Sequence, residues 1–269
     1  MKSEKVYVIT GATGGMGMAI TEKFKDKGRL LLADVSLDRL REVSRGLAAT
    51  GMDVEIMECD VTNKIHIQRL VERTKELGNF TGLIHTAGIS PQMGTPEQIM
   101  KVNLIGTELM LNAFIEIAEK DTVVVCIASM SGHMAPKEED IDNLLDHATA
   151  SQFLEKVVNV TKEDCTLAYR LSKRGVLRLV ERSVKEWGKK GARILSISPG
   201  LINTPQGRKA MDEDPNVLNN MIGINPLGRI GEAGEIASLI EFLFSNQAAY
   251  ITGTDVRIDG GVTPILQGK

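Results

Sequence analysis

The stretch Thr10-Gly11-Ala12-Thr13-Gly14-Gly15-Met16-Gly17 follows an apolar run at residues 6–9 and opens a segment of helical periodicity at 16–27. Glycine permits the tight turn after a strand and lets the backbone approach a ligand closely. Free amides at the start of the following helix attract phosphate groups. The order strand, glycine turn, helix therefore predicts a dinucleotide-binding loop. The residues expected to contact the cofactor here are Gly11, Thr13, Gly15, Met16 and Gly17.

Apolar runs of strand length alternate with longer segments of helical period along the chain. Runs this apolar fit strands that are covered on both faces, as in a parallel sheet. Strands are expected at 6–9, 30–33, 54–57, 83–85, 123–128, 194–197 and 256–258. Helices are expected at 16–27, 36–50, 64–77, 96–120, 165–190 and 232–245. The alternation predicts an α/β fold, a doubly wound Rossmann-type parallel sheet of about seven strands with helices on both faces. We expect one dinucleotide-binding catalytic domain over residues 1–269.

Residues 136–163 do not fit this alternation. Acidic residues flank apolar ones at helical spacing there, which predicts one or two amphipathic helices. We therefore expect a helical insertion at about 134–164. It is either a surface excursion or the wall of a pocket or subunit contact.

Carboxylates follow the second and third expected strands. Asp34 can accept hydrogen bonds from the adenosine ribose hydroxyls and would repel a 2′-phosphate. This favours NAD over NADP as the cofactor, although Arg39 lies five residues further on. Asp60 and Val61 are expected beside the adenine; alternatively, Asp60 caps the following helix.

Tyr169 and Lys173 are four residues apart in a segment of helical period, so they share one helix face. A free tyrosine has a pKa near ~10 and is a poor acid or base at neutral pH. A nearby positive charge favours the phenolate and lowers that pKa. Together with the glycine loop, the pair predicts an enzyme that moves a hydride to or from nicotinamide and a proton through Tyr169.

Composition excludes several other classes of protein. The net charge of −3 favours neither nucleic acid nor an anionic membrane surface as a partner. No apolar run approaches the roughly 20 residues that span a bilayer, and the first residues do not resemble a signal peptide. Cys59, Cys126 and Cys165 lack metal-ligand spacing and fit free thiols in a reducing compartment. We expect a cytoplasmic protein with no bound metal.

These features together resemble the short-chain dehydrogenase/reductase family over residues 6–261. The glycine loop matches its Thr-Gly-x-x-x-Gly-x-Gly motif, and Tyr169 and Lys173 match its Tyr-x-x-x-Lys pair. Ser129 matches the serine after the fifth strand, with Ser131 as its rival, and Asn103 matches the helix asparagine. The catalytic set implied by the resemblance is Asn103, Ser129, Tyr169 and Lys173.

The resemblance also implies roles for these residues. Tyr169 exchanges the substrate proton, and Ser129 hydrogen-bonds the carbonyl oxygen. Lys173 lowers the pKa of Tyr169 and contacts the nicotinamide ribose, while Asn103 supports a water linked to Lys173. Further cofactor contacts are implied for Ala87, Gly88, Tyr169, Lys173, Pro199, Gly200, Ile202 and Thr204.

The chain departs from the family pattern at two places. The family's Asn-Asn-Ala-Gly appears here as His85-Thr86-Ala87-Gly88, and we interpret His85 as a buried, hydrogen-bonded residue rather than a catalyst. Ser129 and Tyr169 are forty residues apart, far more than usual in the family, which the expected insertion accounts for.

The insertion, with the segments at 87–92, 107–110 and 186–188, makes the chain similar to the 3α-hydroxysteroid dehydrogenase/carbonyl reductase branch. That similarity implies a small hydrophobic alcohol or ketone as substrate, a steroid or bile acid among them. Apolar residues of a substrate loop at about 205–228 either line the pocket or pack against the domain. The expected substrate contacts are Ser129, Met130, Ser131, Tyr169, Met211 and Met221.

Other functions stay open at this point. They are a dehydrogenase or reductase of another small carbonyl, polyol or acyl substrate, or a dinucleotide sensor without catalysis. The family's two long helices often form a four-helix interface, and the insertion would cover that surface here. We therefore expect a homodimer through another face, with a tetramer as the alternative.

Overall fold

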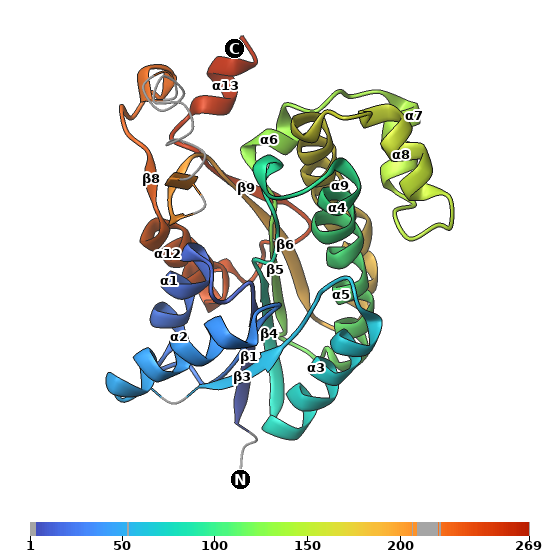
Figure 1. The fold of residues 1–269 in the computed structure, drawn as a ribbon. Helices are drawn as coiled ribbons and strands as arrows, with labels where there is room; N and C mark the ends of the chain where they lie inside the picture. The colour runs from blue at the N-terminus through green and yellow to red at the C-terminus, as the bar shows by residue number, and fades with distance from the viewer. Residues whose placement is uncertain (1–3, 53, 206, 209–219, 221, 269) are drawn as a thin grey trace.

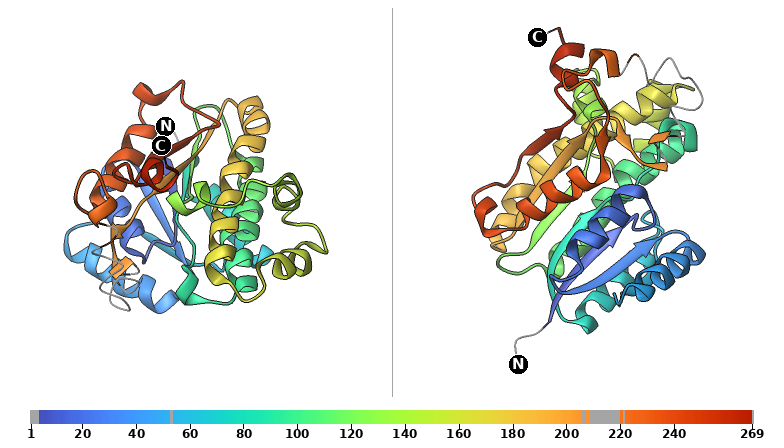
Figure 2. Two further views of the ribbon diagram at one scale, coloured as in Figure 1. Left: turned by 90° about the horizontal axis from the view of Figure 1, so that it is seen from above. Right: turned by 90° about the vertical axis from the view of Figure 1, so that its left-hand side faces the viewer.

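The computed structural model describes residues 4–52, 54–205, 207–208, 220 and 222–268. Seven parallel strands form one sheet in the order β3-β2-β1-β4-β5-β6-β9, and helices cover both of its faces (Figures 1 and 2). The strands are β1 (Lys5–Thr10), β2 (Arg29–Asp34), β3 (Glu55–Glu58), β4 (Asn79–His85), β5 (Val123–Ile127), β6 (Arg193–Pro199) and β9 (Asp255–Ile258). The predicted fold class is confirmed, and each predicted strand lies in this sheet.

Two hydrophobic clusters explain why the strands have uninterrupted apolar runs. In β1, Val6 and Val8 face one cluster, whereas Tyr7 and Ile9 face the other. Successive side chains of a strand point to opposite faces, so a sheet covered on both faces needs apolar residues at every position. The core therefore consists of two layers, one on each side of the sheet.

Helices on the two faces of the sheet form separate layers (Figure 1). One layer contains α1 (Gly15–Phe24), α2 (Leu37–Ala49) and α12 (Ala233–Leu243). The other contains α3 (Lys64–Leu77), α5 (Gly106–Phe114) and α9 (Cys165–Lys189). In the second layer, α9 carries the predicted Tyr169 and Lys173, so packing of this helix against the sheet positions both side chains.

The segment predicted as one helix over 96–120 is divided in the structure. It contains α4 (Pro96–Met100), a π-helical turn η2 (Lys101–Ile105), α5 and a 3₁₀ turn η3 (Ile115–Ile117). The amide of Gly106 reaches back five residues to the carbonyl of Lys101. A π turn inside a helix often occurs at a functional site, and this one contains Asn103.

Several short elements were not predicted, because they are too short to show a period. They are η1 (Pro91–Met93), α6 (Met130–His133), η4 (Asn246–Ala248), α13 (Val262–Leu266), and the small sheet of β7 (Ile202–Asn203) and β8 (Gly231–Glu232).

Two helices occupy the acidic segment, α7 (Glu139–Leu145) and α8 (Phe153–Thr161), as predicted. They lie outside the main body, on the side of α4 and α9 (Figures 1 and 2). Leu145, Phe153 and Val157 are fully buried and belong to the same cluster as the inner face of α9. The apolar positions of these helices therefore fix them to the domain.

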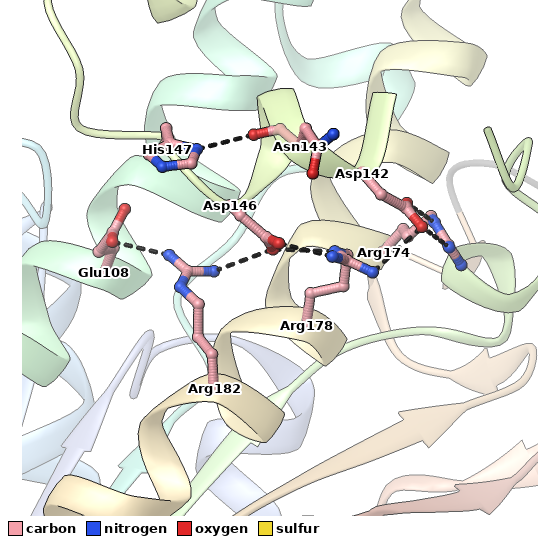
Figure 3. Close-up of polar contacts among 8 residues, drawn as sticks. All are labelled: Glu108, Asp142, Asn143, Asp146, His147, Arg174, Arg178 and Arg182. Atoms are coloured by element: carbon pink, nitrogen blue, oxygen red, sulfur yellow. Dashed lines mark hydrogen bonds and ion pairs between the residues drawn. The ribbon is translucent and has the colours of Figure 1, made fainter. Parts of the chain in front are cut away.

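A ladder of charged groups also joins α7 to α9 (Figure 3). Three arginines of α9, Arg174, Arg178 and Arg182, are spaced four residues apart and so lie on one face of this helix. Arg174 Nε donates to Asp142 Oδ1 at 2.6 Å, and Arg182 Nη2 donates to Glu108 Oε1 of α5 at 2.7 Å. Hydrogen bonding by Arg174 holds the pKa of the Asp142 carboxyl below its usual range. The members of this charge ladder are Glu108, Asp142, Asp146, Arg174, Arg178 and Arg182.

Within the described ranges, none of the helices combines the length and the apolar character that crossing a bilayer requires.

Candidate active site

The glycine loop and the predicted catalytic residues lie at the carboxyl edge of the sheet. Strands β1 and β4 are neighbours there, although the chain leaves them toward opposite ends of the sheet. The strand order therefore reverses direction between β1 and β4. In open parallel sheets, ligands bind beside the carboxyl ends of the strands at such a reversal. The glycine loop follows β1, and Thr86, Ala87 and Gly88 follow β4.

Close approach of backbone explains the glycines of the loop. Gly11 has a φ of +64°, and a Cβ there would lie 2.7 Å from the amide nitrogen of Ala87. A Cβ on Gly17 would lie 2.8 Å from Ala12 Cα. Gly14 is the N-cap of α1 and offers no side chain to the first helical amides. These amides suit a phosphate group, so the loop fits the pyrophosphate of a dinucleotide.

Asp34 lies beside this loop. Its Oδ2 accepts hydrogen bonds from the Thr13 amide at 3.0 Å and from the Thr13 hydroxyl at 2.7 Å. Thr13 thereby holds the carboxylate at the end of β2, where the ribose of a bound dinucleotide would lie. Arg39, the rival sequence signal for NADP, is exposed in the first turn of α2.

Asp60 and Val61 follow β3. The Asp60 Oδ1 accepts from both the amide and the hydroxyl of Thr62, each at 2.8 Å, and Val61 is buried. The alternative reading of Asp60 as a helix cap is wrong, because Asn63 caps α3 by accepting from two of its amides.

The segment after β6 approaches the glycine loop. A Cβ on Gly15 would lie 2.8 Å from Thr204 Cβ, so Thr204 packs directly against the loop. Pro199 ends β6, and Gly200 packs against the backbone of Asp259. Ile202 is buried in β7. Of these four predicted cofactor residues, Thr204 contacts the glycine loop, and Pro199, Gly200 and Ile202 precede it in the segment after β6.

Lys173 and Asn103 come together beside Gly88. A Cβ on Gly88 would lie 3.1 Å from Asn103 Oδ1 and 3.5 Å from Lys173 Nζ. The buried Lys173 ammonium donates to the carbonyl of Ile127 at 2.8 Å, and burial lowers its pKa to about 8. The Asn103 side chain accepts from the Ile89 amide at 2.8 Å and donates to the Ile89 carbonyl at 3.0 Å.

Ser129 and Tyr169 also meet. Ser129 caps α6 by accepting a hydrogen bond from the Ser131 amide at 3.1 Å. Burial raises the pKa of Tyr169, and a side-chain hydrogen bond with Ser129 lowers it by less. Of the two rival serines, Ser129 is therefore the one in contact with the phenol.

The expected lowering of the Tyr169 pKa by Lys173 is not found. The lysine ammonium is 5.8 Å from the centroid of the tyrosine ring, and burial of the phenol dominates. The reason is that burial costs the phenolate more hydration free energy than its contacts in the site return.

The remaining predicted contacts lie in different surroundings. Met130 is buried in α6, and Ser131 is half-buried beside it. Met16 packs partly against the cluster under α1. Met211 and Met221 lie outside the described residues.

Several residues of the site escaped sequence reasoning. Gly132 allows α6 to touch α9, since a Cβ there would lie 2.9 Å from the carbonyl carbon of Lys173. Ser172 accepts a hydrogen bond from Asn103 Nδ2 at 3.1 Å. Its position next to Lys173 in the sequence could have indicated that it belongs to the site. The backbone carbonyls of Ile89 and Ile127 accept hydrogen bonds from Asn103 and Lys173, and no residue type in the sequence indicates such contacts.

Among the side chains that the structure describes, no group of three or more His, Cys, Asp or Glu residues is arranged to hold a metal ion.

Comparison with known proteins agrees with this geometry. A family model described as short chain dehydrogenase matches residues 5–139, and one described as enoyl-(acyl carrier protein) reductase matches residues 148–263. Levodione reductase of Leifsonia aquatica is 29% identical over 96% of this chain and 94% of its own length. The 7alpha-hydroxysteroid dehydrogenase of Bacteroides fragilis is 27% identical over 96% of this chain and 94% of its own length.

Solved structures give the same result. The crystal structure of levodione reductase superposes with a TM-score of 0.78 at 28% identity, covering 96% of this chain and 97% of that chain. The first family model spans half of the sequence, including the glycine loop and Asn103. We conclude that the chain belongs to the short-chain dehydrogenase/reductase family and is an NAD(P)(H)-using oxidoreductase of alcohols and ketones.

Proposed function

We propose that this protein is a cytoplasmic, NAD-dependent enzyme that interconverts a secondary alcohol and a ketone. The substrate class we propose is a 3α-hydroxysteroid or bile acid, as in the 3α-hydroxysteroid dehydrogenase/carbonyl reductase branch. The observation that carries the proposal is that Lys173 lies beside Gly88 and 5.8 Å from the ring of Tyr169, which has Ser129 as a hydrogen-bond partner.

The residues around this edge suit a bound dinucleotide. We assign the glycine loop to the pyrophosphate, Asp34 to the adenosine ribose, and Asp60 with Val61 to the adenine. When bound, NAD supplies the hydride acceptor. The residues assigned to its nicotinamide half are Ala87, Gly88, Tyr169, Lys173, Pro199, Gly200, Ile202 and Thr204.

In this proposal Tyr169 exchanges a proton with the substrate oxygen, because its hydroxyl has Ser129 as a partner. The Ser129 oxygen accepts from the Ser131 amide, and in the proposal its proton passes from the bond with Tyr169 to the substrate oxygen when substrate binds. Lys173 lies beside Gly88, and we assign its buried ammonium to a contact with the nicotinamide ribose. Asn103 holds the Ile89 backbone in place, and its role in supporting a water for Lys173 stays a prediction.

Similarity to a 7alpha-hydroxysteroid dehydrogenase supports the steroid assignment. Similarity to levodione reductase favours a second candidate, a carbonyl compound that is not a steroid. We place Met130, Ser131, Met211 and Met221 among the substrate contacts in either case.

We also propose a homodimer. The charge ladder holds α7 over one face of α9, which leaves less of that helix for contact with a second subunit.

A substrate panel tests the proposed activity. We expect NADH absorbance to rise when hydroxysteroids or bile acids are added with NAD. Simple secondary alcohols and polyols are expected to react more slowly. Turnover of polyols without any response from a steroid would contradict the proposed substrate class.

Tyr169→Phe removes only the hydroxyl that exchanges the proton. We expect turnover to fall about 10²–10⁴-fold, the usual contribution of general acid–base catalysis. Binding of NADH, followed by its fluorescence, should change little. The control is Tyr250→Phe, which removes the hydroxyl of a fully exposed tyrosine and should leave turnover unchanged. Undiminished turnover in Tyr169→Phe would refute the assigned role.

Asp34→Ala tests the cofactor preference. Loss of charge-assisted hydrogen bonds worth about 1.5–3 kcal/mol should weaken NADH binding about 10- to 100-fold. NADPH binding should weaken less or improve, because the negative charge that repels a 2′-phosphate is gone. Titrations with NADH and NADPH measure the ratio of the two dissociation constants. The control is Asp38→Ala, which removes an exposed carboxylate of α2. A wild-type protein that prefers NADPH would contradict NAD as the cofactor.

Light scattering measures the mass of the assembly in solution. We expect the mass of two chains, because α7 and the charge ladder cover part of α9. The mass of four chains would count against the proposed dimer.

A further inference from the structure

A buried histidine joins two parts of the candidate site. His85 is the last residue of β4 and is 2% exposed. Its Nδ1 lies 2.8 Å from Thr10 Oγ1 at the end of β1. Its Nε2 lies 3.1 Å from Thr107 Oγ1 on α5. The imidazole therefore bridges the sheet edge and the helix that follows the π turn.

The direction of each hydrogen bond follows from the number of protons. The Thr107 hydroxyl donates its single proton to the carbonyl of Asn103 at 2.7 Å. Its oxygen must then accept from His85, so Nε2 carries a proton. With Nε2 protonated, a neutral imidazole has an unprotonated Nδ1, which accepts from the Thr10 hydroxyl. The Thr10 oxygen in turn accepts from the Ala87 amide at 3.4 Å.

The surroundings of the ring keep it neutral. Burial, with the nearby charge of Lys173 on α9, lowers the pKa of His85 to about 3. Its neighbour in β5 is Cys126, whose thiol is neutral because burial raises its pKa to about 12. A protonated imidazole would place a second positive charge beside the buried ammonium.

This network ends at both sides of the candidate site. One arm runs through Thr10 to the amide of Ala87, which is assigned to the cofactor. The other arm runs through Thr107 to Asn103, in the π turn beside Lys173. We infer that His85 is a positioning residue, which in its neutral form with a proton on Nε2 fixes Asn103 and Ala87 relative to each other. This inference rests on the proposed function, but its structural part can be measured without turnover.

Two pairs of variants separate the arms. The Gln amide can reach the place of Nε2 and donate to Thr107, whereas the shorter Asn cannot, so we compare His85→Gln with His85→Asn. Thr107→Ser keeps the hydroxyl, and Thr107→Val removes it. We expect kcat to fall about five- to tenfold in His85→Asn and Thr107→Val, as for one lost hydrogen bond. His85→Gln and Thr107→Ser should retain most of kcat, and KM for the cofactor should change little.

Thr74→Val is the matched control. Thr74 is also buried and donates to a carbonyl four residues earlier, but it lies on α3 away from the site. The Thr74→Val variant should lose about as much stability as Thr107→Val, but its kcat should stay that of the wild type. The double variant His85→Asn/Thr107→Val should be no slower than the slower single variant, because both changes remove the same link. Equal loss of kcat in Thr74→Val, or additive losses in the double variant, would mean that the effect is general destabilisation.

Nuclear magnetic resonance of ¹⁵N-histidine tests the inference independently of activity. The signal missing from His85→Gln identifies His85 among the four histidines. We expect a neutral ring protonated at Nε2 that does not titrate between pH 8 and about 5. A ring protonated at Nδ1, or one that titrates near ~6.5 like a free histidine, would overturn the inference.

Stability gives a second readout without substrate. The unfolded chain binds a proton at His85 below pH ~6.5, whereas the folded protein does so only near pH 3. The wild type should therefore lose stability relative to His85→Gln as the pH falls from about 7 to 5. A difference in melting temperature that stays constant over this range would contradict a neutral His85. If no alcohol is oxidised, the proposed function fails, while these two measurements still decide the inference.

Discussion

The burial of the Lys173 ammonium is the constraint on which the rest of the site depends. A charged group that leaves water costs several kcal/mol unless polar atoms replace the lost hydration. The carbonyl of Ile127 does so at 2.8 Å, because the last carbonyls of a parallel sheet are free to accept from side chains. Burial also keeps two titratable groups near this charge neutral. Burial beside the amine lowers the pKa of His85 to about 3, and the Cys126 thiol stays protonated.

Glycines set how closely the other parts can approach this amine. Gly132 brings α6, and with it Ser129, against the turn of α9 that contains Lys173. Gly88 leaves room for Asn103 and Lys173 to meet. A side chain at position 132 would push α6 away from α9, and one at position 88 would press on the Asn103 side chain. The site is therefore assembled by backbone contact as much as by the polar side chains in it.

The sequence was informative where a pattern has a direct physical cause. Burial on both faces gives the strands continuous apolar runs, and Tyr169 and Lys173 share a helix face because they are four residues apart. The start of β4 was missed because Thr81 and Gly82 interrupt its apolar run. The carbonyls that hold Lys173 and Asn103 belong to the backbone, so no residue type announces them. The pKa of Tyr169 depends on the balance between burial and the hydrogen bond with Ser129, which spacing alone does not give.

The π turn at Lys101–Ile105 has a consequence for the length of this segment. Compared with a regular helix, the wider turn holds one extra residue, and each residue of an α-helix advances the phase by about 100°. Ile99 and Met100 before the turn, and Met110 and Phe114 after it, are all fully buried. Because the turn takes up its extra residue locally, both pairs keep the phase of a regular helix that is one residue shorter. A one-residue deletion within the turn would thus close it to a regular helix and leave the core pairs buried, whereas a deletion between the turn and Phe114 would exchange core for surface along a whole helix.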